Sequence, residues 1–270
     1  MIPKIIHYCW FGNGNKSALI QECMKTWKSV LFDYEIREWS EKDLYLFQEN
    51  RYVQQAYKAK KWAFVADVFR LYAVKTFGGI YLDTDVEVRK SFNDFLQHSF
   101  FIGSEKNGKF ESIGTAVIGA EKENPIISDM LCLYDEISFF KQNGLYDLTP
   151  NTIRLVSVLK NYGVQNVYSD QDVIKIGGRA TIYLINYFCI DSAESYAVHH
   201  FEASWIDDYK FKIKFSFVWG KNKRLVLYRF TKNKRSSIFH YPENMIKKIF
   251  EIDYMRKRKL SLVLEECIDA

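Results

Sequence analysis

Two aspartates, Asp83 and Asp85, stand one residue apart after the short apolar run Ile80-Tyr81-Leu82. This run is typical of a buried strand, and side chains alternate along a strand, so both carboxylates are expected on one side. Two carboxylates placed in this way repel each other unless a cation lies between them. Mg²⁺ and Mn²⁺ bind through oxygen and are the obvious candidates. The alternative interpretation is that the two aspartates only begin a solvated loop.

A helix is expected immediately before this strand. From Trp62 onward, apolar residues recur at spacings of three and four, as on a helix that packs against a sheet. Gly78-Gly79 ends the helix, because glycine adopts the left-handed C-cap conformation at little steric cost. Asp67 and Arg70 are three residues apart and share one helix face. They form either a surface ion pair or part of the same polar site as the aspartates.

The first forty residues predict the opening of a doubly wound α/β sheet: a strand from Lys4 to Trp10, a helix over 17–30 and a strand over 35–39. Ligands bind such sheets beyond the carboxyl ends of the strands, which places Trp10 and the two aspartates at one rim. His7 points away from Trp10 by strand alternation, and we expect it in the core. Further helices are expected over 52–61, 125–140 and 151–159, and further strands over 99–103, 113–119 and 196–201.

Composition indicates one large domain, or one domain with an appendage, since 48% of the 270 residues are hydrophobic. The five cysteines are scattered singly among apolar neighbours, which favours reduced thiols over disulfides or a zinc site. No signal-peptide pattern or apolar run of about 20 residues is present, so we expect a cytosolic protein. Residues 210–259 hold sixteen Lys/Arg and three acidic residues, a local charge of +13.

Four segments together resemble the family 32 glycosyltransferases, the DXD-motif enzymes of bacterial capsule and surface-polysaccharide synthesis. They are IPKIIHYCWFG, WAFVADVFRLYAVKTFGGIYLDTDVEV, IGTAVIGAEKENPII and HHFEASW. Fungal initiating mannosyltransferases and the catalytic domains of clostridial glucosylating toxins are similar. The resemblance implies a GT-A catalytic domain over 1–207, an α/β fold with a Rossmann-like nucleotide-sugar-binding sheet and flanking helices. Residues 208–270 are then expected to form a basic, aromatic-rich helical region.

The resemblance also implies a retaining, metal-dependent transfer of a hexose from a nucleotide-sugar, with UDP favoured, to an acceptor hydroxyl. It implies that Asp85 binds Mn²⁺ or Mg²⁺ directly, while Asp83 faces the ribose and sugar and assists the metal. Other site residues are implied in the same way: Asp67 and Arg70 on sugar hydroxyls, Trp10 on the nucleobase, and Ser204 and Trp205 on the diphosphate.

Three further residues are less sharply placed by the sequence. His199 and His200 point to opposite faces of their strand, so at most one reaches the metal; the resemblance implies His200, whose distance from Ser204-Trp205 matches the position that completes metal coordination in related folds. Asn151 either lies near the anomeric carbon and acceptor or caps its helix. No carboxylate is marked as a nucleophile, so double displacement and front-side attack both stay open.

Two other classes of protein compete with this interpretation. The strand with Asp-x-Asp superficially resembles haloacid-dehalogenase-like phosphatases, in which the first aspartate is the nucleophile, but Glu87 occupies a position where those enzymes carry Thr or Val. A non-catalytic basic adaptor is the third possibility. For a transferase, the basic residues after 208 predict peripheral docking on an anionic membrane, where a polyprenyl-diphosphate-linked acceptor resides, because each Lys/Arg near such a surface contributes ~1 kcal/mol. Nucleic acid is not expected as a partner.

Overall fold

The computed structural model describes residues 1–105, 112–141, 144–164 and 173–202, together with the backbone of 106–107, 110–111, 210–219, 223–232 and 235–237. The chain divides into two compact units, Met1–Glu202 and Ala203–Ala270. This division falls slightly before the domain boundary predicted from the sequence, which follows residue 207.

The first unit is an α/β fold built on a seven-stranded, mixed sheet with the order β2-β1-β3-β6-β5-β8-β7. Strands β2, β1 and β3 run parallel, β5 and β8 run parallel, and β6 is antiparallel to both of its neighbours. The strands are β1 (Ile5–Cys9), β2 (Glu35–Trp39), β3 (Gly79–Leu82), β5 (Phe100–Asn107), β6 (Phe110–Ala120), β7 (Ile174–Ile176) and β8 (Ala180–Tyr183). The predicted α/β sheet with flanking helices is confirmed.

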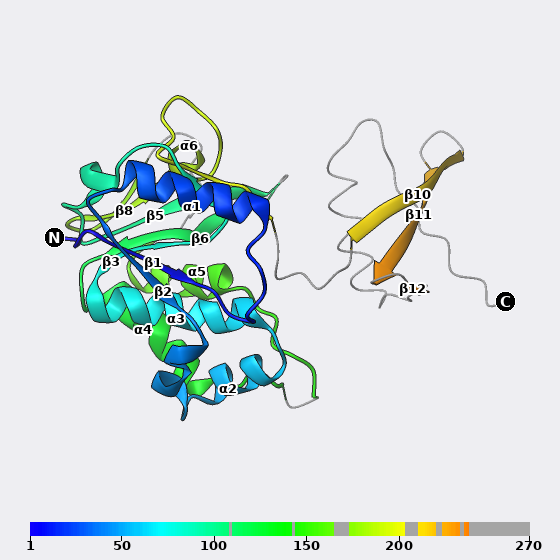
Figure 1. Ribbon diagram of the computed structural model, residues 1–270, viewed down its shortest axis with the longest axis horizontal. Helices are drawn as coiled ribbons and strands as arrows, with labels where there is room; N and C mark the ends of the chain where they lie inside the picture. Colours follow the sequence, from blue (N-terminus) through cyan, green and yellow to red (C-terminus); the bar gives the residue numbers. More distant parts are fainter. Residues whose placement is uncertain are drawn as a thin grey trace. The chain divides into compact units, whose positions relative to one another are not determined.

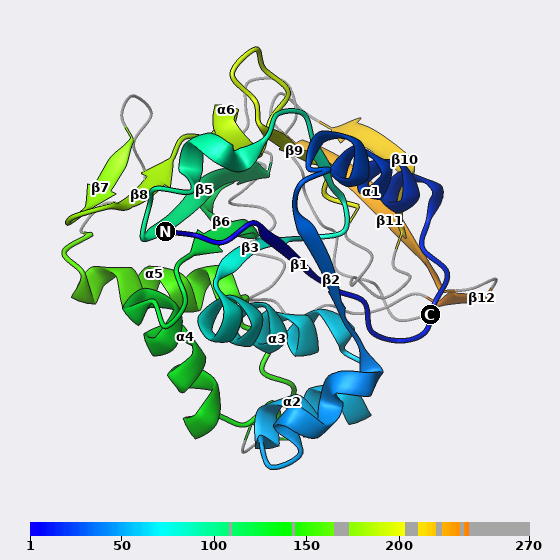
Figure 2. The same ribbon diagram turned by 60° about the vertical axis from the view of Figure 1, so that its left-hand side comes forward.

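Helices cover both faces of this sheet, with α1 and α6 on one side and α3, α4 and α5 on the other (Figures 1 and 2). The α-helices are α1 (Ala18–Val30), α2 (Arg51–Lys58), α3 (Trp62–Phe77), α4 (Pro125–Glu136), α5 (Asn151–Asn161) and α6 (Ile185–Phe188). Two 3-10 helices are also present: η1 (Glu41–Phe47) follows β2, and η2 (Phe92–Phe95) precedes β5. No helix in the described part of the chain is long and apolar enough to cross a membrane.

Strand alternation in β3 separates two hydrophobic cores. Ile80 and Leu82 pack with Trp27 of α1 in one core, while Tyr81 joins Phe69 and Val65 of α3 in the other. The side chain that follows Tyr81 by two positions must then point toward α3. This alternation directs Asp83 to the face that carries Asp67 and Arg70.

A separate two-stranded sheet joins the end of the first unit to the Asp-x-Asp segment. Strand β4 (Val86–Val88) pairs antiparallel with β9 (Ala197–His199), and Val86 stands opposite His199. This pairing connects residues more than a hundred positions apart. It is the contact that brings the late histidines to the aspartates.

The helical character predicted for residues 208–270 is wrong where the structure describes that region. The backbone forms β10 (Lys210–Trp219), β11 (Lys223–Lys232) and β12 (Arg235–Ser237), in an antiparallel sheet of the second unit. Lysines at 210, 212 and 214 alternate with apolar residues at 211, 213 and 215, which is a period of two and favours a strand.

His7 is the buried histidine that the sequence predicts, and its two ring nitrogens are both bonded. Its Nε2–H donates to the Gly78 carbonyl at 2.8 Å, and its Nδ1 accepts from the indole N–H of Trp39 at 3.2 Å. Burial lowers the pKa of His7 to about 4. A second proton on the ring, at Nδ1, would point at the indole N–H of Trp39, and two donors would face each other. The folded protein therefore favours the neutral imidazole.

This environment predicts a loss of stability in mild acid. Because the pKa of His7 is lower in the folded chain than in the unfolded chain, its contribution is complete above about pH 6.5 and disappears as the pH falls toward about 4. The expected loss is roughly 3 kcal/mol in the free energy of unfolding. Urea unfolding of the wild type and His7→Gln across this range measures it, because the difference between the two proteins should shrink in acid. A constant difference would contradict the prediction.

Candidate active site

Asp83 lies at the carboxyl end of β3, where its side chain and backbone together contact groups from three elements. Its Oδ1 accepts from the Tyr81 hydroxyl at 2.9 Å and lies 3.2 Å from Nη1 of Arg70. Its backbone N–H donates to the Ala116 carbonyl of β6 at 2.8 Å. Burial raises the pKa of Asp83, and the charge of Arg70 partly opposes that rise.

Arg70 is a buried cation that connects the helix to this strand. Its Nη2 lies 3.0 Å from Asp67, its Nη1 donates to the Thr115 carbonyl at 2.8 Å, and its guanidinium lies 4.5 Å from the centre of the Tyr81 ring. Asp67 and Arg70 are 8% and 5% exposed, which excludes the surface ion pair considered from the sequence. Burial raises the pKa of Asp67 to about 6, although Arg70 opposes the shift.

Asp85 is held from the other side, by the chain that follows β9. Its Oδ2 accepts from the backbone N–H of Glu202 at 2.8 Å, and its carbonyl accepts from the backbone N–H of His200 at 3.1 Å. Nε2 of His199 lies 3.4 Å from Oδ1. Burial alone would raise the pKa of Asp85, but the hydrogen bond and charge of His199 and the Glu202 N–H outweigh it, so the pKa is lowered.

The histidine that faces the aspartates is His199, which corrects the choice of His200. Nε2 of His200 lies 2.9 Å from the Glu87 carboxylate, on the other face of the short sheet. The prediction that the two histidines point to opposite faces agrees with this arrangement. The spacing to residues 204 and 205 could not identify the inward one, because the β4–β9 register, with Val86 opposite His199, decides it.

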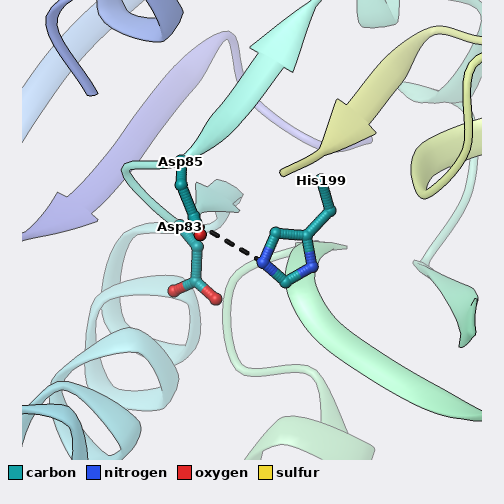
Figure 3. A group of neighbouring side chains, drawn as sticks. All are labelled: Asp83, Asp85 and His199. Carbon is teal, nitrogen blue, oxygen red and sulfur yellow. Dashed lines mark ion pairs between the residues drawn. The ribbon is translucent and has the colours of Figure 1, made fainter. Parts of the chain in front are cut away.

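Asp83, Asp85 and His199 form a group that could hold a metal ion. Figure 3 shows their side chains converging, and one ligand atom from each lies within 4.8 Å of the others. Ligands of an octahedral ion with bonds of about 2.1 Å lie about 3 Å apart when adjacent and about 4 Å apart when opposite. Ligand atoms up to 4.8 Å apart must therefore move closer together before all three groups bind one divalent ion. Two carboxylates and one imidazole are a donor set that suits Mn²⁺.

Glu105 is a further acid in this site, and no sequence motif marks it. Its carboxylate lies 3.2 Å from Nδ1 of His199, so the imidazole stands between Glu105 and Asp85. Burial lowers the pKa of His199, but the two carboxylates outweigh it and raise the pKa to about 10.

Asn151 lies next to this network and does not cap its helix. Its Oδ1 accepts from the Thr115 hydroxyl at 2.7 Å, while the cap position of α5 is Pro150. Asn151 is 3% exposed, and its amide nitrogen has no hydrogen-bond partner in the described part of the chain. The side chain therefore presents a buried donor close to Arg70 and Thr115.

Trp10 follows β1 at the same rim of the sheet as Asp83, because β1 and β3 are parallel. Its indole N–H donates to the Gly14 carbonyl at 2.9 Å, and Nζ of Lys16 lies 4.8 Å from the centre of the ring. The ring is half-buried at the start of the loop after β1. Ser204 and Trp205 lie outside the described residues.

Comparison with known proteins gives a family match over part of the chain. Residues 17–102 match the family described as "Glycosyltransferase sugar-binding region containing DXD motif". The chain is 28% identical over 158 residues to the uncharacterized glycosyltransferase L373 of Acanthamoeba polyphaga mimivirus, a match that covers 56% of this chain and 61% of that protein. Glucan organizing enzyme 1 of Cryptococcus neoformans is 50% identical over 46 residues, 17% of this chain and 13% of that protein. The chain thus spans less than two thirds of these curated relatives.

Two solved structures are also similar to this chain. The PaToxG glycosyltransferase has 21% sequence identity and a TM-score of 0.42, with 61% of this chain and 75% of that one covered. A glycosyltransferase involved in the glycosylation of the major capsid of PBCV-1 has 14% identity and a TM-score of 0.39, with 73% and 93% covered.

The matched segment includes four of the residues that the structure brings together: Asp67, Arg70, Asp83 and Asp85. Residues 17–102 thus match a glycosyltransferase sugar-binding region with a DXD motif, and the first motif aspartate, Asp83, lies beside Arg70 at the carboxyl end of β3.

Proposed function

We propose that the chain is a retaining, metal-dependent glycosyltransferase of the family 32 type. It moves a hexose from a UDP-sugar, of the UDP-galactose or UDP-glucose type, to a hydroxyl of a lipid-linked oligosaccharide in capsular or surface polysaccharide synthesis. The observation that carries the proposal is the convergence of Asp83, Asp85 and His199 within 4.8 Å at the ligand-binding rim of an α/β sheet.

The proposed chemistry divides the work among the site residues. A divalent ion bound by Asp85 and His199, with Asp83 assisting, would offset the negative charge that develops on the departing diphosphate. Asp67 and Asp83 supply acceptors for sugar or ribose hydroxyls, and Arg70 keeps these two buried carboxylates charged. Asn151, with its unbonded amide nitrogen, presents a donor beside them.

The activity is tested by incubating the protein with Mn²⁺ and a panel of UDP- and GDP-hexoses and measuring nucleotide release, with and without glycan acceptors. Release of UDP that depends on Mn²⁺ and on the sugar is the expected result. Thermal stabilisation by each nucleotide-sugar with Mn²⁺ identifies the preferred donor, because a bound ligand stabilises the folded state by mass action. Release from none of the nucleotide-sugars would contradict the proposal.

The two adjacent histidines provide a matched pair of variants. His199→Ala is expected to weaken Mn²⁺ binding by about 100-fold or more, since even outer partners of metal ligands contribute ~10–100-fold. His200→Ala should leave Mn²⁺ binding unchanged, because its ring contacts Glu87 on the other face. Titration calorimetry with MnCl₂ measures both proteins. Equal losses in the two variants would exclude a specific role for His199.

The phosphatase alternative requires Asp83 to act as a free nucleophile. In the structure the Asp83 carboxylate accepts a hydrogen bond from the Tyr81 hydroxyl and forms an ion pair with Arg70. These contacts suit a binding group better than a free nucleophile. The nucleotide-release assay also separates the two functions, because a phosphatase would hydrolyse a generic phosphomonoester and an adaptor would do neither.

We also propose that the enzyme works in the cytoplasm at the inner face of the membrane, where residues 208–270 dock to anionic lipid and bring the site to its acceptor. The local charge of +13 over residues 210–259 supports this docking. Cell membranes washed in high salt should release the protein, because salt screens charges at the surface. A protein that stays soluble at low salt in the presence of anionic vesicles would contradict the docking.

A further inference from the structure

We propose that Glu105 is a positioning residue that orients His199 for metal binding. The Glu105 carboxylate would contact the His199 ring, and the His199 ring would in turn bind the metal. The inference rests on the metal site of the proposed function. It adds an acid from β5 to a site that the DXD motif alone does not describe.

The contacts of the His199 ring separate its two nitrogens by role. Nε2 faces Asp85 Oδ1 at 3.4 Å, within the three-residue metal-binding group, and Nδ1 faces Glu105 Oε1 at 3.2 Å. Nδ1 is buried, and within the described part of the chain it makes no hydrogen bond of good geometry. The Glu105 carboxylate is the charged group that lies next to it. A metal-ligating histidine almost always donates its other N–H to a carboxylate, carbonyl or water, which fixes the tautomer and the ring orientation.

An irregularity in the sheet turns Glu105 toward this position. Strands β5 and β6 pair at Ile102 and Ile118, and the pairing resumes only at Ser104 and Ile113. Between these two pairs β6 has more residues than β5, so its extra residues do not pair with β5. Irregularities of this kind change the direction of side chains near active sites. Glu105 fills the resulting space, and its Oε1 accepts from the backbone N–H of Ala116 at 3.4 Å.

Gly114 provides the room for this side chain. A Cβ atom at Gly114 would lie 2.1 Å from Cγ and Cδ of Glu105, far inside contact distance. Any other residue at 114 must therefore displace the Glu105 carboxylate. The same segment of β6 carries the Thr115 and Ala116 carbonyls that bond Arg70 and the backbone of Asp83. The position of Glu105 is thus set together with that of the aspartates.

Glu105 acts through the histidine rather than as a metal ligand itself. Among the described residues, the group with ligand atoms within 4.8 Å of one another contains Asp83, Asp85 and His199, and Glu105 lies outside it. The Phe201 ring lies 4.0 Å from the His199 ring, centre to centre, and restrains it further. Loss of Glu105 should therefore loosen the ring and not remove a ligand.

The test is a double-mutant cycle on the full chain, with Mn²⁺ as the only ligand. Electron paramagnetic resonance measures the concentration of unbound Mn²⁺, up to millimolar Mn²⁺, and so gives the affinity of each variant. Glu105→Ala is expected to weaken Mn²⁺ binding by ~10–100-fold when His199 is present. In the His199→Ala background the same change should have no further effect, because the residue acts through the ring. Glu105→Gln keeps the size and an acceptor oxygen, and it should retain most of the affinity.

Two further variants separate positioning from charge and from folding. Glu87→Ala removes an equivalent carboxylate that pairs with the neighbouring His200, and it should leave Mn²⁺ binding unchanged. Gly114→Ala displaces Glu105 without deleting it and should weaken Mn²⁺ binding as Glu105→Ala does, with thermal unfolding near that of the wild type. An equal loss for Glu105→Ala in both histidine backgrounds, or no loss in either, would overturn the inference. A wild-type chain that binds no Mn²⁺ would instead overturn the metal site of the proposed function itself.

Discussion

Asp85→Asn is expected to lower the rate of Mn²⁺-dependent sugar transfer by ~1000-fold. This is the size of effect typical when an enzyme loses one group that stabilises charge in the transition state. The variant keeps the shape of the side chain and removes its charge. An amide nitrogen at Oδ2 would face the backbone N–H of Glu202, which now donates at 2.8 Å, and an amide at Oδ1 would face His199. Neither rotamer of asparagine therefore reproduces the contacts of the carboxylate.

The measurement is UDP release from the preferred UDP-hexose over a range of Mn²⁺ concentrations, together with direct Mn²⁺ titration. Both should fail in Asp85→Asn. Asp191→Asn is the matched control, because Asp191 is 70% exposed in its side chain and pairs with Arg89 away from the site. Transfer at the wild-type rate in Asp85→Asn would remove this carboxylate from the mechanism.

Arg70→Met is expected to destabilise the folded chain by about 3–5 kcal/mol, because removal of one member of a buried ion pair leaves the other charge uncompensated. Arg70 is the buried cation beside both Asp67 and Asp83, and methionine fills a similar volume without the charge. It would also leave the Thr115 carbonyl without its 2.8 Å donor. The loss should therefore exceed that of an ordinary surface ion pair, which is worth about 0–1 kcal/mol.

Urea unfolding followed by circular dichroism gives the free energy for Arg70→Met, with Arg37→Met as the control. Arg37 pairs with Glu35 on an exposed part of β2, and its loss should change the free energy of unfolding little. Asp67→Asn in the Arg70→Met background should recover part of the stability, because it removes one of the stranded charges. Equal stability of the wild type and Arg70→Met would show that these carboxylates do not depend on the arginine.

Local signals in the sequence predict the elements of the first unit well. Ser17 caps α1 by accepting from the Ile20 N–H, and Asn124 caps α4 ahead of Pro125, in line with the preference for these residue types at helix N-termini. Alternation along β3 directs Tyr81 and Asp83 toward α3, and the spacing of Asp67 and Arg70 places them on one helix face. These inferences need only geometry that acts over a few residues. They contain most of the aspartate–arginine half of the site.

The other half depends on which strands meet and in what register. The sequence shows that His199 and His200 face opposite ways, but only the pairing of β4 with β9 turns His199 inward and directs His200 to Glu87. Glu105 gives no signal of its own, because its position follows from the irregular pairing of β5 with β6 and from the absence of a side chain at Gly114.

The sequence alone thus determined most of the helices and strands of the first unit as far as α5, the side of the sheet that carries the aspartates, and the DXD motif. The tertiary structure decided which histidine faces the aspartates and placed the Glu105 carboxylate at its Nδ1. Caps and periodicity act between neighbours in the chain, so a short stretch specifies them. The register between distant strands instead minimises the free energy of the whole packed unit, and no single stretch of sequence contains that information.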